Sequence, residues 1–433
     1  MALAAFVVRS GDETRQVQMV CVDDLVPAGD ELRRIERLVD WGQVRVTALP
    51  FYRPGGAGRA GIDPAVLVKL ALVLAWRGLP SMRAVLRVAA TDMSIRRFLG
   101  FGLTEGLPDH STFSHAQTKR FADSSVFEQL FTAVLRQCTD AGLVGGRRLV
   151  VDGTHIEADA ALKSLRAELV DVSAAADAER VTDADAGADR PAVPLRAASL
   201  KLAESRSGPT PKRVASNATV VSRTDPDAKL RHKPGHRKHL VHRGQVAVDP
   251  KARVIVAVQA EHATGSEADA LRDLVTRARF AGHRVAELAA DSGYASQESY
   301  AALEALKTQA LIPPQPGAKH PAAGRARERM RTPVGRDAAV DRQAHAEGAI
   351  AELKRHGASR ARCRGTRLVQ LQLLAAATAI NLKRLIAAQN GAQRDQNGDP
   401  PAHAAAITWL TGLLARVLDE LTRIAAADSS TGS

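Results

Sequence analysis

Apolar positions in the first third of the chain repeat at the spacing of amphipathic helices. Asp63 and Pro64 open one such run, and a capping side chain followed by proline is typical of a helix start. The pattern predicts helices over 64–76, after Ser81, from about 112 to 121 and from about 125 to 141. We therefore expect residues 1–146 to form a helical domain. A DNA-reading helix-turn-helix and an ordinary helical bundle both fit this pattern.

The pattern changes at Arg147, where short apolar runs begin to alternate with amphipathic stretches. The predicted elements are strands over 147–156, 240–249, 253–262, 285–290 and 309–312, and helices over 266–281, 297–306 and 341–355. A hairpin followed by strand–helix crossovers gives a mixed sheet with helices on its faces. The expected fold class is therefore α/β with a helical N-terminal domain, in the element order of an RNase H-like core.

Three further segments lie within this core or after it. Residues from 163 to about 215 are rich in Ala, Asp, Arg and Pro without a clear period, which predicts a loosely ordered insert. A mobile basic loop is expected after Pro314, with Arg325, Arg327, Arg329, Arg331 and Arg336. Helices are predicted over 368–388 and 404–426, before a disordered tail. The α/β core is thus assigned to 147–390, and a C-terminal helix and tail to 391–433.

The chain is strongly basic, with a formal net charge of +13, which favours a polyanion as partner. Aromatic residues make up only 3% of it, so stacking of bases on an aromatic sheet is not expected. The three cysteines are far apart and odd in number, which excludes a disulfide framework and a zinc-finger spacing. The apolar runs are too short to span a bilayer, and a reducing cytoplasm is the expected location.

Two aspartates each follow an apolar run and precede a turn of small residues. Asp152 follows Leu149–Val151, and Asp291 follows Leu288–Ala290. Ligands of α/β sheets bind at the carboxyl ends of parallel strands, so we expect both carboxylates at one crevice. For either aspartate alone, the capping of a loop or helix is an equally good explanation.

The third acid is Glu347, in the predicted helix 341–355. At 100° per residue, Gln343, Glu347 and Lys354 fall in one narrow stripe beside an apolar face, whereas Glu352 is expected to point toward solvent. The apolar face consists of Ala346, Ala349, Ile350 and Leu353. A helical glutamate alone is a weak signal. Three carboxylates together suit two Mg²⁺ ions, for which Mn²⁺ may substitute, because these ions prefer oxygen ligands.

Two basic runs, 229–243 and 354–367, flank the acids in the sequence. Lysine and arginine contacts to phosphate supply affinity and carry little sequence information. The residues expected to contact DNA are Lys354, Arg355, Arg237, Lys238, Arg243, Arg360, Arg362 and Arg364. For each of them a solvated charged face is as good an explanation. DNA contact or solvent exposure is also favoured over metal binding for His232, His236, His239 and His242, because no cysteine accompanies them and basic neighbours repel a cation.

Several short motifs together resemble one protein family. In the first half they are Leu25-Val26-Pro27, Ile62-Asp63-Pro64, Leu79-Pro80-Ser81-Met82-Arg83 and Pro108–Phe113. In the second half they are Val151–Ala158, Thr224–Ala228, Asp291–Tyr294, Ala346–Lys354, Arg364-Gly365 and Asn381–Leu385. With these motifs in this order, the chain resembles transposases of the IS4/IS5 superfamily, most closely the IS1182 group.

The resemblance implies a catalytic DDE triad at Asp152, Asp291 and Glu347, which would also hold the metal ions. It implies that water hydrolyses a phosphodiester at the element's ends and that the freed 3′-OH then attacks target DNA. The partners would be double-stranded DNA and further copies of the chain, as a homodimer or higher oligomer on DNA. Two alternatives stay open, a transposase-derived regulator without catalysis and an RNase H-like nuclease without strand transfer. The intact triad counts against the first, and the N-terminal helical domain counts against the second.

One departure from the family pattern concerns the helix of Glu347. The family often has an arginine four residues before this glutamate, and a lysine seven residues after it. Lys354 fits, but Gln343 stands at the arginine position and Arg342 is one residue away. Val340 stands where the family often has tyrosine. The contacts usually assigned to that arginine and tyrosine therefore have no expected residue in this chain.

Overall fold

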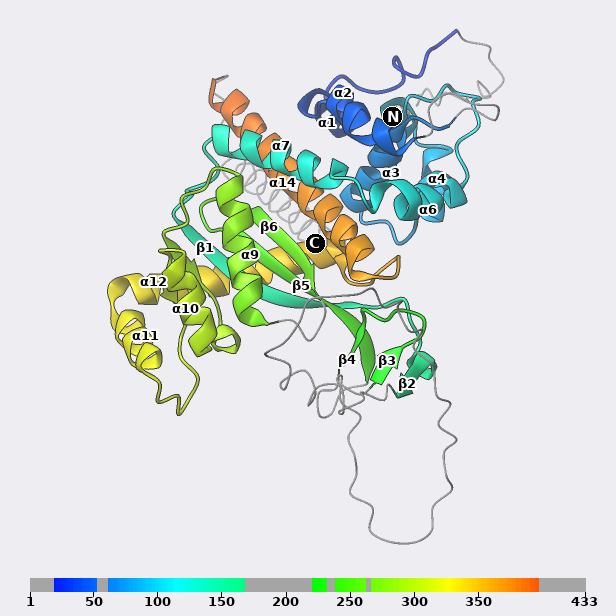
Figure 1. Cartoon of the computed structure of the whole chain (residues 1–433). Helices are drawn as coiled ribbons and strands as arrows, with labels where there is room; N and C mark the ends of the chain where they lie inside the picture. The colour runs from blue at the N-terminus through cyan, green and yellow to red at the C-terminus, as the bar shows by residue number, and fades with distance from the viewer. Residues whose placement is uncertain (1–18, 53–60, 168–219, 232–237, 262–265, 397–433) are drawn as a thin grey trace, which may run out of the picture. The chain divides into compact units, whose positions relative to one another are not determined.

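The computed structural model describes residues 19–52, 61–167, 220–231, 238–261 and 266–396. They form two compact units, one ending at Leu130 and one beginning at Phe131, so that the division falls within a helix (Figure 1). The helix predicted over 404–426, the tail and most of the insert expected at 163–215 lie outside the described residues.

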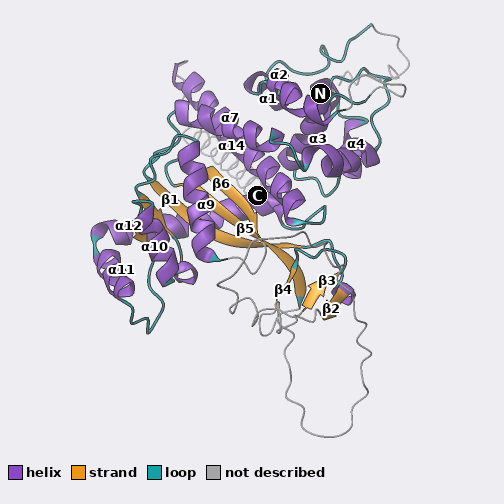
Figure 2. Ribbon diagram, viewed as in Figure 1, coloured by secondary structure: helices purple, strands orange, loops and turns teal. Residues whose placement is uncertain are grey.

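The N-terminal unit is helical, as predicted (Figure 2). Its elements are α1 (Glu31–Leu38), α2 (Trp41–Ala48), the 3₁₀ turn η2 (Leu49–Phe51), α3 (Pro64–Trp76), α4 (Met82–Ala89), α5 (Met93–Leu99), α6 (His110–Ala116), the π-helical turn η3 (Gln117–Phe121) and the start of α7 (Val126–Asp140). The predicted caps are confirmed, because Asp63 accepts a hydrogen bond from the Ala65 amide and Ser81 from the Ala84 amide. Asp109 caps α6, which therefore begins two residues before the predicted start.

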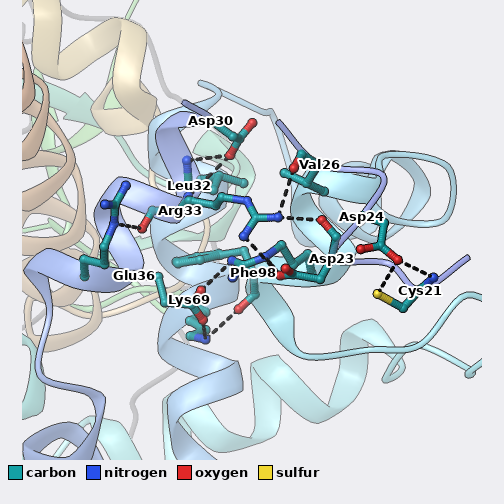
Figure 3. Close-up of polar contacts among 12 residues, drawn as sticks. Cys21, Asp23, Asp24, Val26, Asp30, Leu32, Arg33, Glu36, Lys69 and Phe98 are labelled. Atoms are coloured by element: carbon teal, nitrogen blue, oxygen red, sulfur yellow. Dashed lines mark hydrogen bonds and ion pairs between the residues drawn. The ribbon is translucent and has the colours of Figure 1, made fainter. Parts of the chain in front are cut away.

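The centre of this unit is α3, which is buried along nearly its whole length, including Lys69. The Lys69 ammonium donates to the carbonyl of Phe98 at 2.6 Å and to Glu36 at 3.2 Å (Figure 3). It also lies 4.9 Å from the ring centroids of Trp41 and Phe98. Burial lowers the pKa of Lys69, and the Glu36 carboxylate opposes that shift. The single charge in this apolar helix is therefore tolerated because it is fully paired.

The second unit contains the predicted mixed sheet (Figure 2). Its strands are β1 (Arg148–Glu157), β4 (Lys229–Arg231), β5 (His239–Asp249), β6 (Val254–Glu261), β7 (Glu287–Ala289) and β8 (Gln309–Leu311), in the order β4-β5-β1-β7-β8, with β6 also paired to β5. The β1–β5 and β5–β6 pairs are antiparallel, whereas β1, β7 and β8 are parallel. A separate ribbon of β2 (Leu165–Ala167) and β3 (Val220–Ser222) was not predicted. Its strands are three residues each, too short to show a period.

The predicted helices 266–281, 297–306 and 341–355 are present, and two further helices, α11 (Pro321–Arg331) and α12 (Pro333–Asp341), lie where a loop was expected. The helical elements after β6 are α9 (Glu267–Phe280), α10 (Gln297–Ala305), α11, α12, η6 (Arg342–Ala346), α13 (Glu347–Leu353), η7 (Lys354–Ala358) and α14 (Thr366–Gln396), and the 3₁₀ turns of this unit are η4 (Leu162–Ser164) and η5 (Ser292–Tyr294). Both η6 and η7 are π-helical turns, so the predicted helix 341–355 exists but is not uniformly α-helical. Ser266 precedes α9 as predicted, although its side chain makes no capping hydrogen bond.

The prediction of a mobile basic loop after Pro314 is wrong, because α11 and α12 form a helical hairpin there. Pro321 and Pro333 occupy the first turns of these helices, where a missing amide hydrogen costs nothing, and do not break them. Thr332 caps α12 by accepting from the amide of Gly335. A Cβ on Gly335 would lie 2.3 Å from the carbonyl oxygen of Arg329, so only glycine permits this close crossing.

The helix α14 extends well beyond the predicted 368–388. Within it, Thr366–Ala392 has the length and apolar composition to cross a membrane. However, 78% of its apolar 18-residue stretch is buried inside the structure. Asn381 exchanges two hydrogen bonds with the backbone of Ile255, and Gln370 accepts from the amide of Ala260. These side-chain amides form hydrogen bonds with backbone groups of the edge strand β6. The helix α14 is therefore a core helix that covers this edge of the sheet.

Candidate active site

One small apolar cluster positions all three acids of the predicted triad. It consists of Val150, Ala289, Leu311, Ala338 and Ala346, all at most 2% exposed. Asp152 lies two residues beyond Val150, Asp291 two beyond Ala289, and Glu347 directly after Ala346. Because strand side chains alternate between faces, Asp152 lies on the face of β1 that carries Val150, while Asp291 follows the end of β7 at the start of η5. The three carboxylates therefore gather at one edge of this packed layer.

Asp152 follows the apolar run 149–151 but does not end its strand. The strand β1 continues to Glu157, because its antiparallel pairing with β5 extends that far. The parallel pairing with β7 stops at Val150. Asp152 thus lies inside the long strand β1, two residues beyond the point where the neighbouring strand β7 stops pairing with it. The place of Asp291 beside β1 is therefore set by the short β7 and not by the end of β1.

The local charges show that the acids are close to one another. Burial raises the pKa of Asp152, although the amide of Gly153, which donates to this carboxylate at 2.7 Å, opposes the shift. The negative charges of Asp291 and Glu347 raise this pKa further, and the positive charge of Arg342 lowers it. Each of these groups is therefore near enough to act on Asp152 electrostatically.

Asp291 and Glu347 are held by the starts of two helical turns. Asp291 caps η5 and accepts a hydrogen bond from the amide of Gly293 at 2.9 Å. Glu347 is the exposed first residue of α13. Asp152 and Asp291 are both half-buried, whereas the side chain of Glu347 is exposed to solvent. This difference in exposure leaves room for a large substrate on the open side.

The π-helical turn η6 accounts for the displaced arginine. In such a turn the hydrogen bonds join residues five apart, so Arg342 lies one turn before Glu347. In a regular α-helix the residue one turn before Glu347 would be the one four positions earlier, which is the exposed Gln343. Arg342 is also the residue whose charge acts on Asp152. The one-residue departure in sequence is thus offset by one extra residue in the turn.

A buried polar network behind the acids was not predicted. The Tyr294 hydroxyl donates to the side-chain carbonyl of Gln245, whose amide donates to Glu261 at 3.2 Å. Burial raises the pKa values of both Tyr294 and Glu261. A Cβ on Gly153 would lie 3.0 Å from the Tyr294 hydroxyl and 3.2 Å from the Gln245 oxygen. The Asp152-Gly153 and Asp291–Tyr294 motifs therefore pack against each other. The presence of both motifs was the only signal that the sequence offered for this network.

The expectation that His242 contacts DNA or solvent is wrong. Its ring is fully buried and lies 2.8 Å from the carboxylate of Asp225, which is also fully buried. Burial alone raises the pKa of Asp225, but the contact with His242 and the backbone hydrogen bond from Gly365 together lower it. The amide of Thr366 also donates to Asp227, at 2.8 Å. The Thr-Asp-Pro-Asp-Ala motif thus joins β5 to the start of α14.

The residues expected to contact DNA divide into three groups. Lys354, Arg355, Arg360, Arg364 and Lys238 are exposed. Arg243 is only 17% exposed and ion-paired with Glu267, and burial lowers the pKa of Arg362 to about 10. Arg237 lies outside the described residues, as do His232 and His236, whereas His239 is exposed.

A group of cations surrounds His155 on β1. His155 is exposed on its strand, and partial desolvation of its ring together with the charges of Arg231, Arg243 and Lys354 lowers its pKa to about 4. The imidazole is therefore neutral at pH 7, beside three positive groups. This concentration of charge lies three residues from Asp152 along the strand.

The prediction that Glu352 points to solvent is wrong. Its side chain is 20% exposed and forms an ion pair with Arg384 of α14. It still lies away from the direction of Glu347 and Lys354, as the helical stripe predicts. Glu352 therefore fastens α13 to α14 and is not near the acids.

The donor set fits a hard divalent cation. Among the described residues, no three His, Cys, Asp or Glu side chains are close enough to hold an ion as they stand. The three acids nevertheless offer only oxygen ligands, and their charges repel one another around Asp152. A divalent cation bound by these carboxylates would relieve that repulsion.

Two family models match the chain. Residues 20–119 match the model described as "Transposase domain (DUF772)", and residues 144–382 match the model described as "Transposase DDE domain". No solved structure matches the chain. The second match covers more than half of the sequence and includes all three acids. The chain therefore belongs to the DDE transposase family, with the two-domain architecture typical of IS1182-like members.

Proposed function

We propose that this DDE transposase binds the ends of its own element, cleaves phosphodiesters there and joins the 3′ ends to target DNA. The observation that supports the proposal is that the charges of Asp291 and Glu347 act on Asp152, with each acid one or two residues from a member of one apolar cluster. The mixed sheet with helices on its faces supports an RNase H-like core. A regulator without catalysis would have no need of this arrangement.

Within this proposal, Asp152, Asp291 and Glu347 hold the divalent ions, two Mg²⁺ ions or Mn²⁺ in their place. Such ions supply Lewis-acid stabilisation of the charge on the reacting phosphate and favour ionisation of water. The backbone amide of Gly153 orients one oxygen of Asp152, and that of Gly293 orients one oxygen of Asp291. Arg342 and Lys354 present cations on the same side of their helix, where they stabilise phosphate oxygens.

The proposal is tested with the full chain and a labelled duplex that carries the DNA flanking its coding region. In Mg²⁺ we expect breaks at the junctions between element and flank, followed by joining of the freed 3′ ends to an added plasmid. A random duplex of equal length is the control. Cleavage without any joined product would favour the nuclease alternative, and binding without cleavage would favour the regulator.

Arg342→Ala is expected to reduce end cleavage by about 10²–10³-fold, the usual loss for one charged contact to a transition state. The reason is that the positive charge of Arg342, in the turn directly before Glu347, acts on Asp152. The matched control is Gln343→Ala, which removes an exposed side chain and should have little effect. Initial rates of cleavage at saturating DNA measure both. A larger loss for the Gln343 variant would show that the helix has the α-helical register here.

Lys354→Ala is expected to reduce cleavage by about 10²-fold, because this cation lies on the side of the helix that presents Glu347. Glu352→Gln should change the cleavage rate of the folded protein much less. Because it breaks the ion pair with Arg384, it should lower the melting temperature by about 2–6 °C. Calorimetry and cleavage rates distinguish the two effects. A catalytic loss for Glu352→Gln with unchanged stability would contradict the assignment.

A further inference from the structure

The helix formed by α6 and η3 in the N-terminal unit has one exposed face made only of polar side chains. These are Ser111, Ser114, His115, Thr118 and Lys119, at spacings of three and four residues that place them on one side. Ala116 and Phe121 are buried on the other side. The guanidinium of Arg120 lies 4.2 Å from the ring centroid of Tyr52, which fixes the rotation of the helix.

This polar face carries one formal positive charge, on Lys119, and has free hydrogen-bond donors. Among the described residues, His115 and Lys119 have no ion-pair or hydrogen-bond partner for their side chains. The sequence from His110 to Ala122 contains no acid. Asp109 precedes the helix, but its carboxylate caps the amide of Ser111, and the hydrogen bonds from Ser111 lower its pKa to about 2. No negative charge therefore opposes a polyanion along the face itself.

Two further cations lie beside the face. Arg83 and Arg87 are exposed one turn apart on α4, and they line a shallow hollow of about 540 Å³ between α4 and α6 together with His110 and Asp109, whose side chains form an ion pair. Arg96 also lines this hollow, but its guanidinium donates to the carbonyls of Gly102 and Glu105 and thus serves to hold the loop before α6. The surface thus combines a polar helix with a flanking pair of arginines.

The helix that a helix-turn-helix would use to read DNA is not available. After α4, a three-residue turn leads to α5, which would be the reading helix of such a motif. However, Ile95, Arg96, Phe98 and Leu99 of α5 are buried. The later helix, reached through the segment 100–109, does present a polar face to the outside.

We infer that α6 and η3 form the helix that enters the major groove of duplex DNA at the element's ends, while Arg83 and Arg87 contact the flanking phosphates. Hydroxyl, imidazole and ammonium groups hydrogen-bond to base edges, and two serines allow a close approach of the backbone. A protein interface would have an apolar centre, and this face has none. The inference rests on the proposed function, since it names the element within the N-terminal unit that recognises the ends.

The test uses the full chain, anisotropy of a labelled flanking duplex, and a random duplex of equal length and composition. His115→Ala/Lys119→Ala should weaken binding to the flanking duplex by about 10–100-fold and reduce the preference over the random duplex. Arg83→Ala/Arg87→Ala should weaken binding to both duplexes alike and reduce the slope of log affinity against log salt by about two. The control is Arg37→Ala, an exposed cation on α1 outside this surface.

Circular dichroism confirms that each variant is folded. The inference is overturned if the His115/Lys119 variant binds like the Arg37 control, or if it loses affinity equally for both duplexes. These outcomes are separable from failure of the proposed function. If the wild-type protein cleaves and joins DNA while the His115/Lys119 variant binds normally, only the reading helix is wrong. If the variant loses its preference but the wild-type protein never cleaves, the reading helix stands and the transposition chemistry does not.

Discussion

Asp152→Asn, Asp291→Asn or Glu347→Gln is expected to reduce cleavage of end DNA by at least about 10³-fold, while folding and DNA binding persist. Each amide keeps the shape of the carboxylate but cannot hold a divalent ion as an anion. Folding should be preserved, because burial and the neighbouring acids already disfavour the charged form of Asp152, and Glu347 is exposed. Cleavage rates, melting curves and duplex affinity are measured on the same preparations.

The matched control is Glu157→Gln, an exposed acid on the same strand β1 that lies away from the apolar cluster. It should cleave at nearly the rate of the wild-type protein. A triad variant with near-normal Mg²⁺-dependent cleavage would remove that residue from the proposed triad. Loss of folding in all three variants together would instead show that these acids have a structural role.

Removal of divalent ions with EDTA is expected to stop cleavage completely, and added Mg²⁺ or Mn²⁺ should restore it. The reason is that the three acids offer only oxygen ligands, which such ions prefer. Ca²⁺ should support DNA binding without turnover, because its larger and more flexible coordination holds the phosphate without the required geometry. Full cleavage in EDTA would refute the metal-dependent mechanism. Restoration by Zn²⁺ alone would refute the assignment of Mg²⁺.

The element order of the core was predictable from the sequence because each element carries a local signal. The hairpin of β5 and β6 lies close to its predicted bounds, since turn residues separate two apolar runs. The helices α3 and α4 begin at the predicted caps. Where proline and arginine were taken as loop signals, at α11 and α12, the prediction failed. Proline there occupies the helix starts. Ala338 of α12 packs in the apolar cluster, a tertiary contact that the sequence did not reveal.

The candidate acids could be selected from the sequence, but their surroundings could not. Asp152 and Asp291 stood out because each follows an apolar run, and the family matches cover both. The sequence could not show that η6 is a π-helical turn, because one extra residue in a helix leaves no compositional trace. It likewise gave no sign that His242 is buried against Asp225, since basic neighbours surround it in the chain. Both features depend on contacts between segments far apart in sequence.

The sequence by itself determined the order of helices and strands, the basic character of the chain and the identity of the three acids. These properties follow from local periodicity, capping and composition, which neighbouring residues set. Only the tertiary structure decided which arginine acts electrostatically on Asp152, which cations are already paired, and that Glu352 fastens two helices together. Those outcomes depend on how β7 ends beside β1 and how α13 and α14 pack, and packing between distant segments is fixed by the whole fold.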